Sequence, residues 1–331
     1  MPGACEKRSN PNLLPSESIR TPEAGHNWRV ATPAPQGGTV IVVGSINMDL
    51  VFAGLPVLPT PGQTLAAQHF HTLPGGKGAN QASAAAAVGA DVQLIGAAGT
   101  DSLGDAALAD LATRGVGLAH VNRVQEPTGV AAVLIENSGE NIVIIAAGAN
   151  ATVGQSSVTA AETVVSHNVV VLACLEIPVD AVLAWARVSR ERGWTFILNP
   201  APAQSLPAEL LDLVDVITPN ETELAPLGSV AELLARGIRA VIVTLGEDGA
   251  RLHTASGEHH QAAFPCVPVD TTGAGDAFNG ALAAAIAEGQ SMENAVEFAA
   301  AVGALATEKV GARNALPTRT EAIALLEAQR S

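Results

Sequence analysis

Two carboxylates six positions apart, Asp270 and Asp276, flank a run of small residues in the segment DTTGAGDAFNG. The backbone amides of Gly273, Ala274 and Gly275 precede an Ala-rich apolar run that is typical of a helix, and free amides at a helix start attract an anion. An acid after such amides is either a base beside the anion or a cap that stabilises the helix by about 0.5 to 2 kcal/mol. The segment alone leaves both alternatives open.

A second glycine-rich segment, GGKGAN, consists of Gly75, Gly76, Lys77, Gly78, Ala79 and Asn80. Glycines let a ligand approach the backbone closely, and a lysine and an asparagine offer donors to a hydroxylated ligand. A Walker A loop would need glycine at position 71 and Ser or Thr at 78, where His71 and Gly78 stand. A flexible turn with a solvated lysine is the alternative.

Further polar residues follow β-branched runs that are typical of strands. They are Asn47 and Asp49 after TVIVVGSI, Glu176 after NVVVLACL, Asn220 and Glu223 in TPNETE, and the residues from Thr244 to Gly249 in TLGEDG. In open parallel sheets the ligand crevice lies beyond the carboxyl ends of the strands, so we expect these residues to meet there. Taken singly, TPNETE and TLGEDG are equally explained as an acidic loop and an ordinary turn.

The composition excludes several classes of protein. The chain has 331 residues, 48% of them apolar, and 17 Lys and Arg against 32 Asp and Glu, which disfavours a nucleic-acid partner. No apolar run approaches the ~20 residues of a membrane span, so no membrane partner is expected. Cys5, Cys174 and Cys266 cannot form a framework of disulfides, and a reducing, cytoplasmic location is predicted. The histidines lack partners at zinc-ligand spacing.

Short strand-like runs alternate with Ala-rich helical patterns from Thr39 onward. This alternation predicts an α/β fold with a doubly wound, mostly parallel sheet covered on both faces. Two stretches, around 48–73 and 128–148, alternate apolar and polar residues instead, and the second contains the hairpin signal NSGEN. They predict a small β-sheet that serves as a lid or an oligomer contact. Residues 1–38 are rich in Pro, Ser, Asn and Glu and predict a disordered or loosely docked tail before a domain spanning 39–331.

Seven segments in order, GSINMD, GGKGANQA, LEIP, LNPAPA, TPNETE, TLGEDG and DTTGAGDAFNGAL, resemble the ribokinase-like carbohydrate kinase family from about Thr39 to Pro317. The resemblance implies a three-layer sandwich with a small β-sheet lid. It also implies transfer of the γ-phosphate of ATP to the 5-hydroxyl of D-ribose, Mg²⁺ on the nucleotide, K⁺ as an activating ion and a homodimer paired through lid strands. Deoxyribose or another pentose as the acceptor, and a catalytically silent sugar-sensing or scaffold protein, are the alternatives.

The resemblance assigns roles residue by residue. Asp276 is the expected general base, and the amides of Gly273, Ala274 and Gly275 are the expected anion hole. The expected sugar-binding residues are Asn47, Met48, Asp49, Gly75, Gly76, Lys77, Gly78, Ala79, Asn80, Glu176 and Asp276. The expected nucleotide-binding residues are Asn220, Thr244, Leu245, Gly246, Glu247, Asp248, Gly249, Gly275 and Asp276.

The resemblance also assigns the ions. The expected K⁺ ligands are Asp270, the carbonyl of Thr272 and backbone oxygens of Ala306, Lys309 and Gly311, and Glu223 is expected to act on Mg²⁺ through water. Two positions depart from the family pattern. Ala315 stands where a serine usually completes the K⁺ site, and Ala300 where a polar side chain often lies near the nucleotide. Altered ion or nucleotide affinity is expected from both, with activity retained.

Overall fold

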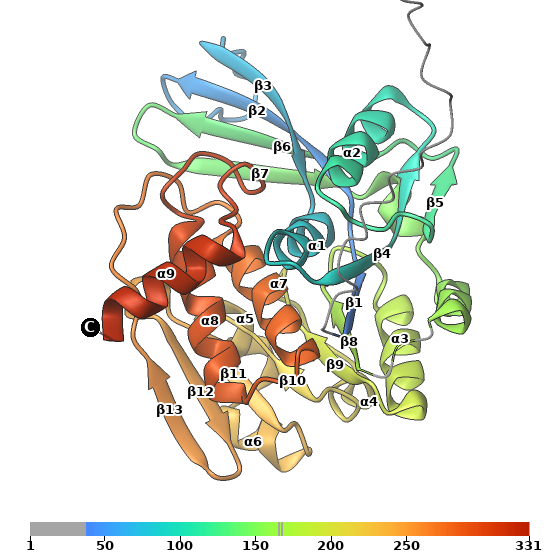
Figure 1. Cartoon of the computed structure of the whole chain (residues 1–331). Helices are drawn as coiled ribbons and strands as arrows, with labels where there is room; N and C mark the ends of the chain where they lie inside the picture. Colours follow the sequence, from blue (N-terminus) through green and yellow to red (C-terminus); the bar gives the residue numbers. More distant parts are fainter. Residues whose placement is uncertain (1–37, 165, 167, 331) are drawn as a thin grey trace, which may run out of the picture. The chain divides into compact units, whose positions relative to one another are not determined.

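A mostly parallel sheet lies at the centre of the fold in the computed structural model (Figure 1). Within the described residues, 38–164, 166 and 168–330, it has nine strands in the order β13-β12-β11-β10-β9-β8-β1-β4-β5. The parallel strands are β1 (Thr39–Val43), β4 (Asp91–Gly99), β5 (Val121–Val124), β8 (Val169–Ala173), β9 (Thr195–Leu198), β10 (Val216–Ile217) and β11 (Ala240–Thr244). An antiparallel hairpin of β12 (Ala250–Thr254) and β13 (Gly257–Gln261) closes one edge. The predicted tail lies outside the described residues, apart from Gly38.

Alternate side chains of each central strand enter two separate hydrophobic layers. In β1, Val40 and Val42 face one layer, whereas Ile41 and Val43 face the other. The first layer contains α1 (Lys77–Ala87), α2 (Ser102–Thr113), α7 (Ala274–Ala287), α8 (Met292–Leu305) and α9 (Arg319–Arg330). The second contains η2 (Gln155–Thr163), α3 (Val179–Arg192), α4 (Ala208–Leu211) and α6 (Val230–Ala235). This arrangement confirms the predicted doubly wound α/β fold.

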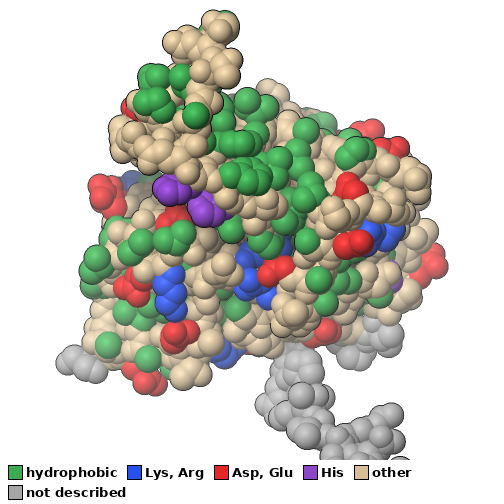
Figure 2. Space-filling view, turned by 90° about the horizontal axis from the view of Figure 1, so that it is seen from above, with side chains coloured by type: hydrophobic (Ala, Val, Ile, Leu, Met, Phe, Trp, Pro, Cys, Tyr) green, Lys and Arg blue, Asp and Glu red, His purple; other side chains and the backbone are tan. Residues whose placement is uncertain are grey.

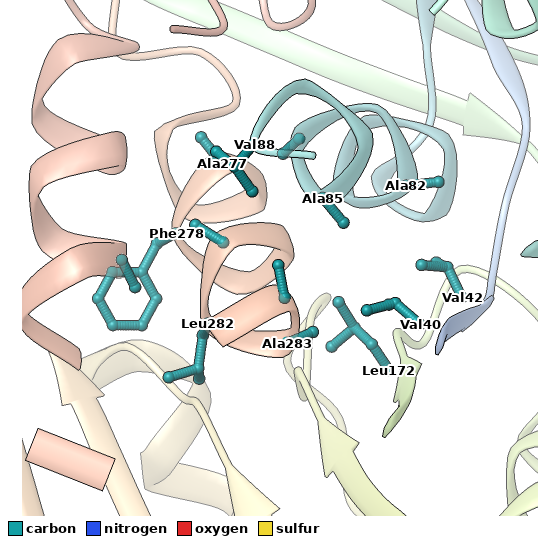
Figure 3. Close-up of a cluster of buried hydrophobic side chains, with 14 of the residues drawn as sticks. Val40, Val42, Ala82, Ala85, Val88, Leu172, Ala277, Phe278, Leu282 and Ala283 are labelled. Atoms are coloured by element: carbon teal, nitrogen blue, oxygen red, sulfur yellow. The ribbon is translucent and has the colours of Figure 1, made fainter. Parts of the chain in front are cut away.

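The first layer holds α1 and α7 close together over the sheet (Figure 3). The two helices are rich in alanine, and Leu282 of α7 and Leu172 of β8 fill the space between the helices and the sheet. Each fully buried leucine stabilises the fold by about 1.5 to 3 kcal/mol relative to an exposed one. A methyl group at Gly280 would lie 2.4 Å from the carbonyl oxygen of Gln81, so the close approach of α7 to α1 requires glycine there. The packing therefore fixes the starts of the two helices relative to each other.

A smaller sheet is present over the two stretches for which lid strands were predicted. Its order is β3 (His69–Gly75), β2 (Asn47–Leu55), β6 (Gly129–Glu136) and β7 (Asn141–Ala146). β6 and β7 are antiparallel across the NSGEN turn, where Gly139 has a φ of 94°. All residues of β7 are exposed, and Figure 2 shows hydrophobic side chains gathered on the upper surface of the molecule. The role of this sheet as a lid stays a prediction.

The order of the large sheet predicts a ligand crevice at the end of β1. From β1 the chain continues to β4 on one side and to β8 on the other, which makes this the point where the winding reverses. Ligands of doubly wound sheets bind outside the carboxyl ends of the strands at such a point. Ser45 and Asn47 follow β1 and Glu176 follows β8, so polar side chains lie where the topology predicts a ligand. The remaining short elements are η1 (Gly148–Thr152), α5 (Glu221–Leu224), η3 (Ala225–Leu227) and η4 (Gly246–Asp248).

Candidate active site

Glu176 is the residue on which three elements converge at the sheet edge. Its Oε2 accepts hydrogen bonds from Ser45 Oγ at 2.5 Å, Asn47 Nδ2 at 3.4 Å and the backbone amide of Lys77 at 3.0 Å. Gly76 lies just before that amide with a φ of 92°, a conformation that favours glycine. One carboxylate therefore joins the end of β1, the start of α1 and the end of β8, and it brings together residues that the sequence predicted separately.

Asp276 lies in the first turn of α7, which begins after Gly273 in the left-handed region with a φ of 79°. Its carboxylate is 7% exposed and accepts hydrogen bonds from two side chains of α1. Asn80 Nδ2 donates to Oδ2 at 3.0 Å, and Gln81 Nε2 donates to Oδ1 at 3.1 Å. The N-cap of α7 is Gly273, and no side chain caps it. Asp276 therefore faces α1 and is not the N-cap of its own helix, although it is an acid in the first turn of that helix. Its role as a base stays a prediction.

Two pockets meet beside Asp276. The smaller has a volume of about 220 Å³ and is lined by Lys77, Asn199, Ala201, Thr218, Asn220, Glu223, Thr244, Gly273, Gly275, Asp276 and Asn279. The larger has a volume of about 610 Å³ and is apolar over much of its wall. Its predicted residues are Asn220, Thr244, Gly246, Glu247, Gly249, Ala274, Gly275 and Ala300. Since Asn220, Thr244 and Gly275 line both pockets, a ligand of the larger pocket can extend to Asp276.

The charges around Asp276 shift the pKa values of their neighbours. Burial raises the pKa of Asp49 to about 6, with Glu176 and Asp276 reinforcing the rise and Arg313 opposing it. The carboxylate of Asp276 raises the pKa of Lys77 against the opposite effect of burial, and Glu176 adds to the rise. Lys77 therefore stays protonated and supplies a positive charge at the pocket that Asp276 lines.

Comparison with known proteins identifies the family. The chain matches the profile of the pfkB family carbohydrate kinases over residues 38–319. The chain belongs to this family. It is 38% identical over 302 residues to a ribokinase from Haemophilus influenzae, a match that covers 87% of this chain and 98% of the relative. The solved ribokinase from Thermotoga maritima is similar, with 33% sequence identity and a TM-score of 0.81. The ribokinase from Arabidopsis thaliana, solved in complex with ribose and ATP, is also similar, with 34% identity and a TM-score of 0.80. Each match covers 88% of this chain and 99% of the other chain.

In this pfkB family kinase, Asn220 and Glu223 have a structural role as well as a place in the pocket. They form a capping box at the start of α5, in which each side chain accepts a hydrogen bond from the other's backbone amide, at 2.8 and 2.9 Å. Burial raises the pKa of Glu223, while Lys77 lowers it. Glu223 lines the smaller pocket, so a cation or a water can reach it from there.

The predicted K⁺ residues lie in two segments joined by Asp270. Its Oδ1 accepts from the amide of Thr272 at 2.9 Å and its Oδ2 from the amide of Gly311 at 2.8 Å. Burial opposes ionisation, but these hydrogen bonds outweigh it and hold the pKa of Asp270 below its ordinary value. Ala315 is buried, offers no side-chain oxygen, and donates its amide to the carbonyl of Gly311 at 3.1 Å. Carbonyl and carboxylate oxygens suit a hard cation, so the residues present fit K⁺ with one ligand fewer.

Within the part of the chain that the structure describes, no group of three or more His, Cys, Asp or Glu could hold a metal ion. Cys174 is buried, and its burial raises the pKa of the thiol to about 11, as expected of a structural cysteine.

Many predicted residues do not line either pocket, and among them are most residues of the expected sugar site: Asn47, Asp49, Gly75, Gly76, Asn80 and Glu176. Met48 and Ala79 are buried in the hydrophobic layer of α1, and Gly78 packs against Gly44. Leu245 packs against the second layer, and the carbonyl of Asp248 accepts a hydrogen bond from His260. Direct contacts of these side chains with a ligand stay predictions. The amide of Ala274 donates to the carbonyl of Thr271 at 3.2 Å, which leaves the amides of Gly273 and Gly275 as the better candidates for an anion hole.

Sequence reasoning missed several residues that support the site. Gln81 and Asn199 form a chain of buried amides with Asp276, with Gln81 Nε2 donating to Asn199 Oδ1 at 3.0 Å. Asn150 donates to Asn47 Oδ1 at 2.7 Å. Arg313 donates to Asn80 Oδ1 at 2.9 Å. Gln81 directly follows GGKGAN and could have been found from that position, whereas Asn150 and Arg313 have no local signal.

Proposed function

We propose that this protein phosphorylates D-ribose at the 5-hydroxyl with ATP, and that Asp276 is the general base. The observation that carries the proposal is the place of Asp276, a buried carboxylate that lines a polar pocket adjoining a larger, more apolar one. The kinases that it resembles include ribokinases, and the Arabidopsis protein was solved with ribose and ATP. ATP suits the larger pocket, which reaches Asp276 through the residues that it shares with the smaller one.

The proposed mechanism assigns each step to residues of the site. The sugar lies among Asn47, Asp49 and Glu176, whose oxygens accept hydrogen bonds from its hydroxyls. Asp276 takes the proton of the attacking hydroxyl as the phosphoryl group transfers, a role that requires hydrogen-bond reach to that oxygen. The amides of Gly273 and Gly275 stabilise the charge on the transferring group, and the ammonium of Lys77 adds a positive charge.

We propose the ions by the same reasoning. Asp270 with the carbonyls of Thr272, Ala306, Lys309 and Gly311 would hold K⁺. Mg²⁺ would accompany ATP, with Glu223 acting on it through water. Glu223 lines the pocket with a pKa raised by burial, and a nearby cation would lower that pKa and favour the ionised form.

The exposed apolar strand of the small sheet supports a homodimer. In β7, Ile142, Val143, Ile144 and Ile145 are between 40% and 58% exposed, and Phe70 of β3 is 56% exposed. An edge strand of this kind is a template for pairing with a second chain. We propose that two copies of this protein pair through these strands over their sugar sites.

A cytoplasmic location is also proposed. Cys174 and Cys266 are free thiols, as in a reducing compartment. No described helix combines the length and the hydropathy that a membrane crossing needs.

A coupled assay of ADP release over a panel of pentoses, with and without K⁺, tests the proposal. We expect the highest kcat/KM with ribose and a marked fall when Na⁺ replaces K⁺. A higher kcat/KM for deoxyribose or another pentose would change the substrate. The absence of sugar-dependent ADP release would leave a sugar-sensing or scaffold protein.

A further inference from the structure

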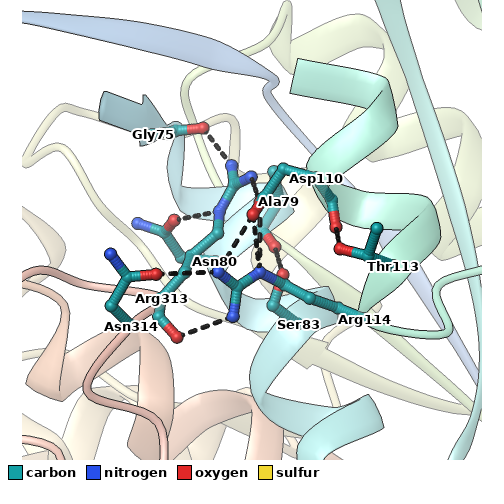
Figure 4. Close-up of polar contacts among 9 residues, drawn as sticks. All are labelled: Gly75, Ala79, Asn80, Ser83, Asp110, Thr113, Arg114, Arg313 and Asn314. Carbon is teal, nitrogen blue, oxygen red and sulfur yellow. Dashed lines mark hydrogen bonds and ion pairs between the residues drawn. The ribbon is translucent and has the colours of Figure 1, made fainter. Parts of the chain in front are cut away.

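Arg313 is a buried cation that contacts the sugar end of the site from outside both pockets. Its side chain is 2% exposed, and it follows α8 in the loop that also carries Gly311. Figure 4 shows its three partners: Nε donates to Asn80 Oδ1 at 2.9 Å, Nη1 pairs with Asp110 Oδ2 at 2.8 Å, and Nη2 donates to the carbonyl of Gly75. The guanidinium therefore joins α1, α2 and the end of β3.

The hydrogen bond to Asn80 has a consequence for the carboxylate of Asp276. An asparagine amide has one oxygen end and one nitrogen end, and only the oxygen accepts a bond from a guanidinium. Because Arg313 binds Oδ1, the Nδ2 of Asn80 is directed to Asp276 Oδ2, which it meets at 3.0 Å. A guanidinium offers several donors in a rigid plane, so it can hold Asn80, Gly75 and Asp110 at the same time.

We infer that Arg313 is a positioning residue for phosphoryl transfer, which orients Asn80 toward Asp276 and holds the Gly75 carbonyl beside the sugar. The inference rests on the proposed function, because it assigns Asp276 the role of base. Arg313 touches neither the sugar nor ATP in this scheme and acts through Asn80. Asp110 anchors the guanidinium and also pairs with Arg114 at 2.9 Å.

The charge of Arg313 gives a second effect, on Asp49. The charged groups that act on Asp49 are Arg313, Glu176 and Asp276, and of these Arg313 favours the ionised carboxylate whereas the two acids oppose it. Loss of the guanidinium leaves Asp49 with the two acids and with its burial. The pKa of Asp49 then rises, so the side chain stays protonated to higher pH. The acidic limb of the kcat/KM profile for ribose shifts to higher pH as a result.

Arg319 provides a control at the opposite end of α1 and at the end of α7. It donates to the carbonyl of Val88 at the end of α1 at 3.0 Å and pairs with Glu288 at the end of α7 at 2.5 Å. Arg319 and Arg313 therefore both tie a helix end to a carboxylate, but Arg319 contacts no residue of the site. A purely structural role for Arg313 predicts lower stability with an unmoved acidic limb, as for the substitution of Arg319.

The experiment compares wild type, Arg313→Met, Arg313→Lys and Arg319→Met by steady-state kinetics from pH 5 to pH 9, with folded protein quantified by its thermal transition. For Arg313→Met we expect kcat to fall about 10- to 100-fold, as for small misplacements of reacting groups. We expect its acidic limb to move up by about one pH unit. Arg319→Met should lose thermal stability and keep the kcat and the acidic limb of the wild type.

Arg313→Lys separates the effect of the positive charge from the effect of the guanidinium geometry. It also provides the test if Arg313→Met does not fold. A lysine keeps the positive charge near Asp49 but lacks the planar fork, so kcat should fall about 3- to 10-fold while the acidic limb stays in place. A wild-type kcat in Arg313→Lys or Arg313→Met overturns the inference. So does a fall in kcat that is the same in Arg319→Met as in Arg313→Met, with the acidic limb of Arg313→Met unmoved. A wild type that does not phosphorylate ribose would instead overturn the proposed function, and the inference would fall with it.

Discussion

Asn80 and Asp276 lie 196 positions apart in the sequence, and a hydrogen bond of 3.0 Å joins their side chains. Each belongs to the first turns of a helix that begins at a glycine-rich segment, Asn80 in α1 and Asp276 in α7. The bond is possible because the two helices pack directly against each other in the same hydrophobic layer. The two glycine-rich segments of the sequence thus form the two sides of one site, with the sugar residues on the side of α1 and the anion-binding amides on that of α7.

Asp276→Asn should lower kcat at least about 100-fold, because a general base contributes a factor of that order. The affinity for ribose should change little, since the amide keeps the size of the side chain. A coupled assay and calorimetry of ribose binding measure the two quantities. Asp101→Asn is the matched control, because Asp101 is a true N-cap that accepts from the amide of Gly104 at 2.8 Å. Near-wild-type turnover in Asp276→Asn would remove Asp276 as the base.

Ribose binding should weaken in acid as Asp49 takes up a proton. The pKa of Asp49 is raised to about 6, by burial first and then by neighbouring acids. A protonated carboxyl accepts fewer hydrogen bonds from sugar hydroxyls, so affinity should be full above about pH 7 and fall below about pH 6. Calorimetric titration with ribose from pH 5 to pH 8 measures this. In Asp49→Asn the affinity should be low and independent of pH across that window, and a persistent slope would assign the titration to another group.

A rise in pH through the raised pKa of Asp49 makes the fold less stable, whereas it makes ribose binding stronger. Asp49 has a higher pKa in the folded chain, about 6, than the 3.8 of an unperturbed carboxyl. The folded state therefore binds the proton more tightly, and the stabilisation from this group is present at low pH and lost as the pH rises through about 6. Asp49→Asn removes the buried charge, so its melting temperature at pH 8 should exceed that of the wild type. A lower melting temperature would contradict the burial of the charged form.

The parts of the site that lie in short motifs could be predicted from the sequence, and the parts that depend on distant contacts could not. Lys77 and Asp276 stand in glycine-rich segments whose spacing indicates backbone near a ligand. Arg313 lies 233 positions from Asn80, and no pattern near it indicates that its side chain is buried. For the fold, continuous apolar runs predicted six of the seven parallel strands, and β5, with the sequence VNRV, was missed because it has no such run. The edge hairpin of β12 and β13 was missed because its outer strand, GEHHQ, is polar and largely exposed.

Restoring a serine at position 315 should strengthen activation by K⁺. Ala315 is 1% exposed and lies one hydrogen bond from Gly311, so a hydroxyl there would add an oxygen beside the predicted ion. Ala315→Ser should lower the K⁺ concentration that gives half-maximal activity, and Asp270→Asn should raise it. Titrations of activity with K⁺ at constant ionic strength measure both. Equal half-maximal concentrations in all three proteins would place the ion elsewhere.

A charge on the exposed strand of the small sheet should separate the proposed dimer. Ile144 of β7 is 58% exposed, and a lysine there would be buried without a partner if two such strands pair. Ile144→Lys should sediment as a monomer where the wild type sediments as a dimer. Val267→Lys is the control, because Val267 is 77% exposed and lies outside this sheet. A wild type that sediments as a monomer, or a dimer that survives Ile144→Lys, would contradict pairing through β7.

Gly280→Ala tests whether the contact between α1 and α7 sets the geometry of the site. Alanine inside a helix ordinarily stabilises it by about 0.5 to 1 kcal/mol relative to glycine. Here the new methyl group would lie 2.4 Å from the carbonyl oxygen of Gln81, a backbone atom that no rotamer change can move. The helices must separate, so the free energy of unfolding should fall by about 1 to 3 kcal/mol. Because α1 carries Asn80 and α7 carries Asp276, kcat should fall as well.

Gly303→Ala in α8 is the matched substitution for stability. A methyl group at Gly303 has its nearest neighbour at 3.4 Å, which is ordinary van der Waals contact, so helix propensity should prevail and stability should rise. Urea denaturation of both variants separates steric from helical effects, and a coupled assay on Gly280→Ala follows the site. If Gly280→Ala were as stable and as active as the wild type, the two helices would have room to adjust, and the alignment of Asn80 with Asp276 would depend on their side-chain partners alone.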